Sequence, residues 1–335
     1  EYFSEEHVKC EYLYISRASA YMVGMTDWPM HRIWHLFGGK NKKSIKKILA
    51  IAGLDASEHI SDIHHVGFPD EEYIPVSGEE HKVHWLINKL FPYILLKNTQ
   101  HREVYADYFK TACEGYKNIA LIDVGWMGNI QSVFARSLGA QWAEKQIHGF
   151  YLATFAGAND NRSIYNKMFG WLTNYGHPND KCDLFLSGGV EIMEFAMADN
   201  TGSTIGYKKT DNGIIPVRED SSGSEIEYLK KAARLQSGII SFFEYVKPLI
   251  QKSVVLSEPF FELIARPSSA QLDALSSLTH SESAGSNAER IVLAKKLPLK
   301  DKLFPGENYI KELNASYWKE GFKRINRKKF WAKYN

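Results

Sequence analysis

The pattern of apolar and polar positions along the chain predicts an α/β protein. Residues 118–122 form an almost continuous apolar run, which is typical of a parallel strand buried on both faces. A helical stretch follows at 129–138, with Gly139 as its expected end, and the run 147–154 predicts the next strand. Strand, helix and strand within about 35 residues indicate a βαβ unit. We therefore expect a mostly parallel, Rossmann-like sheet flanked by helices, with a more helical C-terminal region.

The same periodicity predicts the remaining elements. Residues 11–15 are a short apolar run that indicates a further buried strand. Two runs on either side of Asp211-Asn212-Gly213 predict a hairpin. Helical spacing is found over 44–54, 81–96, 99–113, 190–198 and 225–250, and Pro92 is expected to interrupt the second of these helices. We expect residues 1–176 to form an α/β core and residues 177–335 a mainly helical region packed on it as one unit.

Composition and charge narrow the class of protein. Of 335 residues, 44% are hydrophobic and 13% aromatic, which is enough for a packed core. Lys plus Arg is 41 and Asp plus Glu is 39, so the global balance does not favour a nucleic-acid partner. The three cysteines are scattered without CxxC spacing, which fits a reducing cytoplasm better than a disulfide framework or a zinc site. Because the sequence begins at Glu1 and enters a strand almost at once, we interpret it as part of a longer protein.

The clearest chemical signal follows the run 118–122. The first residue after a buried parallel strand lies at the carboxyl edge of the sheet, where open α/β folds bind ligands. Here that residue is Asp123, which could hold Mg²⁺ or a sugar hydroxyl; the alternative is a tight turn with Asp123 as a helix cap. Glycines allow a sharp turn close to a ligand, and the start of the next helix suits a phosphate. We predict phosphate contacts from Gly125, Trp126, Gly128, Asn129 and Gln131.

Two further groups of residues are candidates for the same site. Ser16 and Arg17 end the run 11–15 and reach the same edge, where Arg can grip a phosphate with two hydrogen bonds, although it could also form an ordinary ion pair. Glu191 and Glu194 are three residues apart and would share one helix face. They could orient an acceptor hydroxyl or hold a metal, or they could be solvated acids. We prefer Glu194, because the apolar run 195–198 follows it directly.

The combined motifs resemble a bacterial family. The resemblance is carried by residues 12–17, 121–131, 149–152, 191–194, 202–207 and 266–267, and so spans most of the chain. These segments are similar to the glycan phosphoribosyltransferase half of dual-domain ribofuranosyltransferases, which lies downstream of a haloacid-dehalogenase-like phosphatase domain in polysaccharide-assembly proteins. The resemblance implies transfer of 5-phosphoribose from phosphoribosyl pyrophosphate (PRPP), with Mg²⁺, to a lipid-linked O-antigen or capsule glycan. Asp123 or Glu194 would act on the acceptor.

The resemblance also implies partners and a division of the chain. A fused phosphatase domain would remove the 5-phosphate, residues 1–176 would bind the donor, and residues 177–335 would face the acceptor. Two other functions remain open at this point. One is a glycosyltransferase that uses a sugar nucleotide, and the other is a non-catalytic glycan-binding domain that tethers a phosphatase.

The C-terminal segment allows two interpretations. Aromatic and basic residues interleave over 317–334, and Trp318, Phe322 and Ile325 recur at helical spacing beside a cationic face. Such a segment can lie on an anionic bilayer, which would place a cytoplasmic enzyme at the inner face of the membrane. Alternatively, it is a terminal helix whose apolar stripe packs on the domain.

Overall fold

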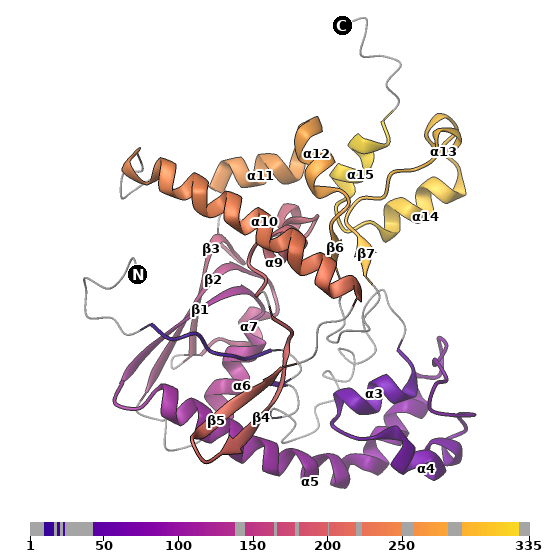
Figure 1. Ribbon diagram of the computed structural model, residues 1–335. Coiled ribbons are helices and arrows are strands. Elements are labelled where there is room, and N and C mark those ends of the chain that lie inside the picture. The colour runs from indigo at the N-terminus through magenta and orange to yellow at the C-terminus, as the bar shows by residue number, and fades with distance from the viewer. Residues whose placement is uncertain are drawn as a thin grey trace, which may run out of the picture.

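A three-stranded parallel sheet lies at the centre of the fold (Figure 1). The computed structural model describes residues 10–16, 19–20, 23, 43–137, 145–163, 166–177, 181–199, 201–218, 223–249, 257–280 and 290–327. The strand order is β1-β2-β3, and the protein is α/β with more helices than strands. The strands are β1 (Asn118–Trp126), β2 (Gln146–Thr154) and β3 (Asn166–Asn174).

The predicted βαβ unit is confirmed. Helix α6 (Asn129–Ser137) joins β1 to β2, and the two strands pair in parallel with Asp123 opposite Tyr151. The short α7 (Ala158–Asn161) then leads to β3, which also runs parallel and which the sequence analysis did not anticipate. The carboxyl ends of all three strands therefore meet at one edge of the sheet.

Helices cover one face of the sheet, and the expectation that both faces of residues 118–122 are buried is wrong. On β2, Ile147, Tyr151 and Ala153 are buried, whereas Phe150 on the opposite face is 47% exposed. Ile122 on β1 is 81% exposed. The reason is that the described helices pack against one face of the sheet, on the central strand as well as on β1, so a continuous apolar run does not imply two covered faces here.

Residues 11–15 form no strand, contrary to expectation. The backbone N–H and carbonyl of Tyr14 bond to side chains instead of to a neighbouring strand. The Tyr14 N–H donates to the Tyr108 hydroxyl at 3.3 Å, and the Tyr207 hydroxyl donates to the Tyr14 carbonyl at 2.6 Å. Leu13 and Ile15 nevertheless pack in the cluster beside β1, so the segment still lies next to the sheet.

A long helix carries the N-terminal part of the chain. Helix α5 (Glu80–Ala112) runs without a break through Pro92, so the predicted interruption is wrong. Leu90 and Ile94, on either side of the proline, are fully buried in one cluster, and this packing offsets the hydrogen bond that proline cannot make. The other helices of this cluster are α3 (Ile45–Ile51), η2 (Ala56–His59) and α4 (Ile60–His65).

The predicted hairpin is confirmed as β4 (Thr204–Thr210) and β5 (Gly213–Arg218). It lies against α5, where Tyr207 contacts the rings of Tyr105 and Phe109 (Figure 1). The remaining C-terminal elements are α8 (Cys182–Phe185), α9 (Gly189–Ala196), α10 (Gly223–Val246), η4 (Lys247–Leu249), α11 (Ser257–Ala265), α12 (Ser269–Leu275), β6 (Thr279–His280), β7 (Ile291–Val292), α13 (Leu299–Leu303), α14 (Glu307–Ala315) and α15 (Lys319–Ile325).

The aromatic stripe near the C-terminus belongs to the core. Trp318 and Phe322 are fully buried, and the Trp318 Nε1–H donates to the Ile264 carbonyl at 2.9 Å. Their cluster also contains Ala153 and Phe155, so the C-terminal helices pack on the sheet. The interpretation of a terminal helix packed on the domain is thus confirmed up to residue 327; the aromatic and basic residues after it lie outside the described residues.

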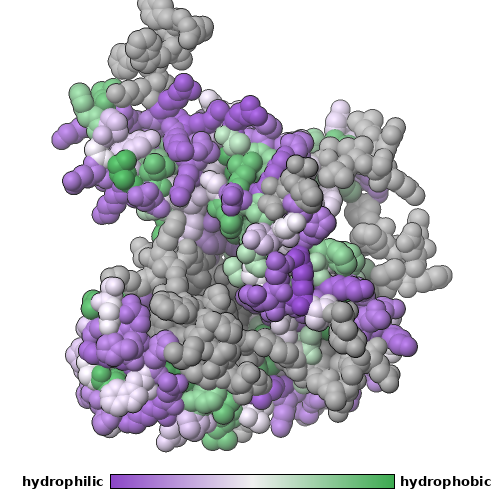
Figure 2. Space-filling view, turned by 180° about the vertical axis from the view of Figure 1, so that it is seen from behind, coloured by the Kyte–Doolittle hydropathy of each residue, from purple (hydrophilic) through white to green (hydrophobic). Residues whose placement is uncertain are grey.

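The described surface is mostly polar. In the view of Figure 2, hydrophilic side chains cover most of the helical upper part, and hydrophobic ones form small separate patches. Within the described ranges, no helix is long and apolar enough to cross a bilayer.

Replacing Trp318 tests whether the stripe is core. Trp318→Ala leaves a large cavity, so we expect unfolding in denaturant to require about 3–5 kcal/mol less free energy than in the wild type. The matched control is Phe304→Ala, because Phe304 is 77% exposed and its loss should change the free energy of unfolding by about 0.5 kcal/mol or less. Equal effects of the two changes would show that Trp318 is not in the core.

Candidate active site

The carboxyl end of β1 differs in one respect from what its sequence predicts. Pairing with β2 continues through Gly125 and Trp126, opposite Ala153 and Thr154. Asp123 therefore lies within β1 rather than directly after it. The strand ends at Trp126, and α6 begins three residues later at Asn129.

The backbone at this point adopts an unusual conformation. Gly125 has a φ of +124° and Gly128 a φ of +66°. Among the described residues, Trp126 is the non-glycine residue with a positive φ, at 93°. Such conformations are costly and persist where surrounding contacts enforce them, often at functional sites.

The side chain of Trp126 provides those contacts. Its ring stacks on Phe155 with centroids 5.5 Å apart and planes 11° apart. Its Nε1–H donates to the Glu194 Oε1 at 2.8 Å. Trp126 thereby connects the end of β1 to α9, across 68 residues of sequence.

Both glycines pack against the protein's own atoms. A Cβ at Gly125 would lie 2.4 Å from the Ala153 carbonyl oxygen, and a Cβ at Gly128 would lie 2.3 Å from the Met168 Sδ. The space that a side chain would need is therefore filled by β2 and β3. The close approach of a ligand, which the sequence analysis expected these glycines to permit, stays a prediction.

Glu194 contacts two side chains from distant elements, Trp126 and His280. Besides Trp126 on Oε1, the His280 Nδ1 lies 3.5 Å from Oε2. The His280 ring packs edge-on against Tyr317, with centroids 5.0 Å apart. Glu191, one turn earlier on α9, is buried, whereas the Glu194 side chain is 27% exposed, so Glu194 is the more accessible of the two acids.

Asp123 is the second carboxylate of the site. The residue is exposed, and its Oδ1 accepts a hydrogen bond from the Val124 N–H at 2.7 Å. Although the residue as a whole is exposed, protein atoms around its carboxyl group limit hydration of that group, and this effect raises the pKa of Asp123 above its ordinary value. The negative charge of Glu194 raises the same pKa further, against the lowering effect of the Val124 N–H. The two predicted carboxylates are thus close enough to influence each other.

Of the other predicted site residues, Ser16 and Asn129 form hydrogen bonds with other parts of the chain, and Arg17 is not among the described residues. The Ser16 hydroxyl donates to the Thr204 carbonyl at 2.5 Å, and Arg17 lies outside the described residues. Asn129 accepts from the Asn161 amide at 2.8 Å, at the start of α6.

Gln131 lies in a buried network on the covered face of the sheet. It is 1% exposed, and it accepts from the Tyr151 hydroxyl at 2.6 Å and donates to Asn166 at 2.7 Å. A Cβ at Gly149 would come within 1.9 Å of its Oε1. This geometry gives Gln131 a packing role; the phosphate contact expected of it stays a prediction.

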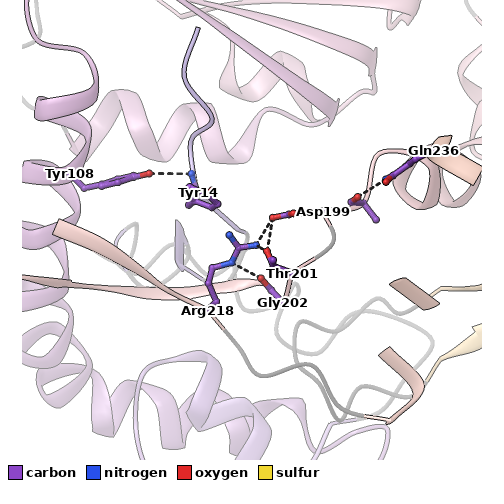
Figure 3. Close-up of polar contacts among 8 residues, drawn as sticks. Tyr14, Tyr108, Asp199, Thr201, Gly202, Arg218 and Gln236 are labelled. Carbon is purple, nitrogen blue, oxygen red and sulfur yellow. Dashed lines mark hydrogen bonds and ion pairs between the residues drawn. The ribbon is translucent and has the colours of Figure 1, made fainter. Parts of the chain in front are cut away.

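Sequence reasoning missed a polar cluster beside the site (Figure 3). Arg218, the last residue of β5, pairs with Asp199 and donates to the Gly202 carbonyl at 2.7 Å. Its guanidinium also lies over the Tyr14 ring, 4.7 Å from the centroid. Limited hydration, Asp199 and, to a smaller degree, Asp123 raise the pKa of Tyr12, against the lowering effect of Arg218, so Tyr12 is within electrostatic reach of both acids. No motif marks Arg218 or His280, because each meets its partners only through the fold.

The predicted Mg²⁺ has one suitable carboxylate here. In the part of the chain that the structure describes, no group of three or more His, Cys, Asp or Glu could hold a metal ion. Mg²⁺ that accompanies a phosphorylated substrate needs only one or two carboxylates, because phosphates and waters supply the other ligands. Both oxygens of Glu194 face donors, so Asp123 is the residue that fits such an ion.

The packing of Gly125 can be tested against a second glycine. Gly125→Ala combines a left-handed backbone with a clash against Ala153, so we expect the free energy of unfolding to fall by about 2–4 kcal/mol. Gly115 also has a positive φ, +79°, but a Cβ there would meet no atom within 4 Å. Gly115→Ala should therefore cost only about 1–2 kcal/mol. Chemical denaturation of both variants measures the difference, and equal losses would contradict the close packing at Gly125.

Comparison with known proteins leaves the function to be argued from this site. A scan against protein-family models finds no match for the chain, and a search of the curated proteins finds no similar sequence. The resemblance stated above therefore rests on the motifs that carry it. The arrangement of Asp123, Trp126, Glu194 and His280 is the starting point for a functional proposal.

Proposed function

We propose that the chain is a phosphoribosyltransferase that moves 5-phosphoribose from PRPP to a bacterial surface-polysaccharide acceptor. The observation that carries the proposal is that Asp123, in the carboxyl half of a parallel strand, is close enough to Glu194 on α9 to be influenced by its charge, with both acids in segments that resemble this family. In parallel α/β sheets this edge is where ligands bind. Gly128 and Asn129, at the start of α6, would receive the phosphates.

The chemistry requires positioning and one proton transfer. A hydroxyl oxygen of the acceptor forms a bond to C1 of the ribose, and the bond from C1 to pyrophosphate breaks, with the electron pair leaving on pyrophosphate. The hydroxyl proton goes to a carboxylate. Bound Mg²⁺ would neutralise charge on the leaving group.

The contacts of the two carboxylates favour different tasks for them. Glu194 is fixed by Trp126 and His280, whereas Asp123 is exposed and bonds to the N–H of its own neighbour. We assign the proton to Asp123 and treat Glu194 as a positioning residue. The charge of Glu194 increases the affinity of Asp123 for a proton, which makes it a better base near neutral pH.

The proposal includes a location. Among the described residues, Cys10, Cys113 and Cys182 form no disulfide, which suits a reducing cytoplasm. Peripheral contact with the inner face of the membrane would use exposed basic residues such as Lys319, Lys323 and Arg324, because the Trp318 stripe is core. A fused phosphatase and a lipid-linked glycan acceptor are the proposed partners.

A transfer assay tests the activity directly. The chain is mixed with PRPP, Mg²⁺ and a panel of O-antigen oligosaccharides, and we expect mass spectrometry to show added phosphoribose. Asp123→Asn should lower the rate about a hundredfold or more, because it removes the base. Glu103→Gln on the exposed side of α5 is the control and should leave the rate unchanged.

Other outcomes of this assay would contradict the proposal. Transfer from UDP-sugars but not from PRPP would identify a sugar-nucleotide glycosyltransferase. Glycan binding without turnover of any donor would identify a non-catalytic binding domain. Full activity in Asp123→Asn would move the active site elsewhere.

The pH profile tests the roles of the two carboxylates. Asp123 must be ionised to accept the proton, so its raised pKa places the acidic limit of activity above the usual range for aspartate. Glu194→Gln removes the neighbouring charge but keeps an oxygen for Trp126, so the acidic limit should move to lower pH. Asp183→Asn, an exposed acid on α8, is the control. An unchanged acidic limit in Glu194→Gln would contradict the assignment.

A further inference from the structure

A stripe of buried polar groups on α5 has no partner among the described residues. Asn98 and Tyr105 are both fully buried. The side-chain amide of Asn98, the Nε and Nη2 of Arg102 and the hydroxyl of Tyr105 are buried without a hydrogen bond. The spacing of four and three residues places the three side chains on one face of the helix.

This arrangement is energetically costly as it stands. A buried polar group without a partner lowers the free energy of unfolding by about 1–3 kcal/mol, and a buried charge lowers it by more. Native proteins satisfy nearly all such groups, so a cluster of three unsatisfied side chains needs an explanation, and a bound water or ion is one that fits. Within the described ranges, Arg102 has no ion pair.

The chemistry of the stripe selects an anion. Arg102 carries a permanent positive charge and five N–H donors in a planar fork. Burial raises the pKa of Tyr105 well above its ordinary value, so its hydroxyl stays protonated and can donate. Asn98 contributes an amide that can also donate. Phosphate oxygens form strong hydrogen bonds with cationic donors, and this helix face offers one cation and two neutral donors.

The surroundings hold the stripe in place. The Tyr105 ring packs edge-on against Phe109 with centroids 4.5 Å apart and against Tyr207 with centroids 5.4 Å apart. Tyr207 belongs to the hairpin strand β4, which lies along α5 (Figure 1). These contacts fix the direction of the Tyr105 hydroxyl before any ligand binds, which reduces the cost of binding.

We propose that Asn98, Arg102 and Tyr105 form a buried binding site for a phosphate group. The site is defined by these three side chains alone and does not rest on the proposed transferase activity. The phosphate is either an inorganic ion or part of PRPP, and the two sources offer the same oxygens to the stripe.

Calorimetric titration with inorganic phosphate, pyrophosphate and PRPP tests the site. We expect at least one of these probes to bind the wild type and to raise its melting temperature, because a ligand of the folded state stabilises it. Arg102→Gln should weaken that binding about tenfold or more. Lys110→Gln, an exposed cation on the same helix, is the matched control and should bind as the wild type does. If Arg102→Gln weakens the binding of PRPP and inorganic phosphate does not bind, the sugar phosphate is the source.

A second variant keeps the test decisive if Arg102→Gln does not fold. Tyr105→Phe removes one unsatisfied hydroxyl and keeps the ring, so without phosphate its melting temperature should equal or exceed that of the wild type. When phosphate is added, the melting temperature of Tyr105→Phe should rise by less than that of the wild type. The proposal fails if no probe binds the wild type, or if the gain is the same in the wild type, Arg102→Gln and Tyr105→Phe.

Discussion

The hydrogen bond from the Trp126 indole to Glu194 is the contact on which the proposed site depends. It is 2.8 Å long and joins the last residue of β1 to α9. Without it, the end of the sheet and the C-terminal helices would still share a hydrophobic cluster, but Glu194 would lose the donor that directs its Oε1. The positive φ of Trp126 is the conformational cost of this connection.

The hydrogen bond between Trp126 and Glu194 fixes the positions of neighbouring groups. The stacking of Trp126 on Phe155 fixes the indole from the sheet side, and His280 holds the other oxygen of Glu194 from the C-terminal side. A fixed negative charge thus stands beside Asp123, and the pKa of Asp123 responds to it. Two carboxylates with different surroundings can divide the work of one proton transfer, which is the arrangement expected of an acid–base site.

Local patterns predicted the parts of the fold that local forces decide. The helix at 44–54 has its four apolar positions buried and a Ser44 cap, and the hairpin forms where Asp211-Asn212-Gly213 indicated it. The motif after residue 122 placed Asp123 directly after the strand, whereas the structure places it in the carboxyl half of β1. Glu194, which was preferred over Glu191, is the acid whose charge raises the pKa of Asp123. These features depend on periodicity, caps and turn residues within a few positions of one another.

The remaining features depend on contacts between distant segments. The segment 11–15 forms no strand, because the hydroxyl groups of Tyr108 and Tyr207 form hydrogen bonds with the backbone N–H and carbonyl of Tyr14. Helix α5 continues through Pro92 because the residues on either side of the proline are buried. Gln131 belongs to a network that only the pairing of β2 with β3 creates. His280, Arg218 and the unpaired stripe on α5 likewise become visible only in three dimensions.

The most direct test of the account observes the indole of Trp126 itself. In a spectrum of the ¹⁵N-labelled protein, the Trp126 Nε1–H signal can be assigned by its absence in Trp126→Phe. If PRPP binds at the end of β1, adding it with Mg²⁺ should shift this signal, whereas the buried Trp318 indole, bonded to the Ile264 carbonyl, should not move. A Trp126 signal that stays in place at saturating PRPP would contradict a donor site beside Asp123 and Glu194.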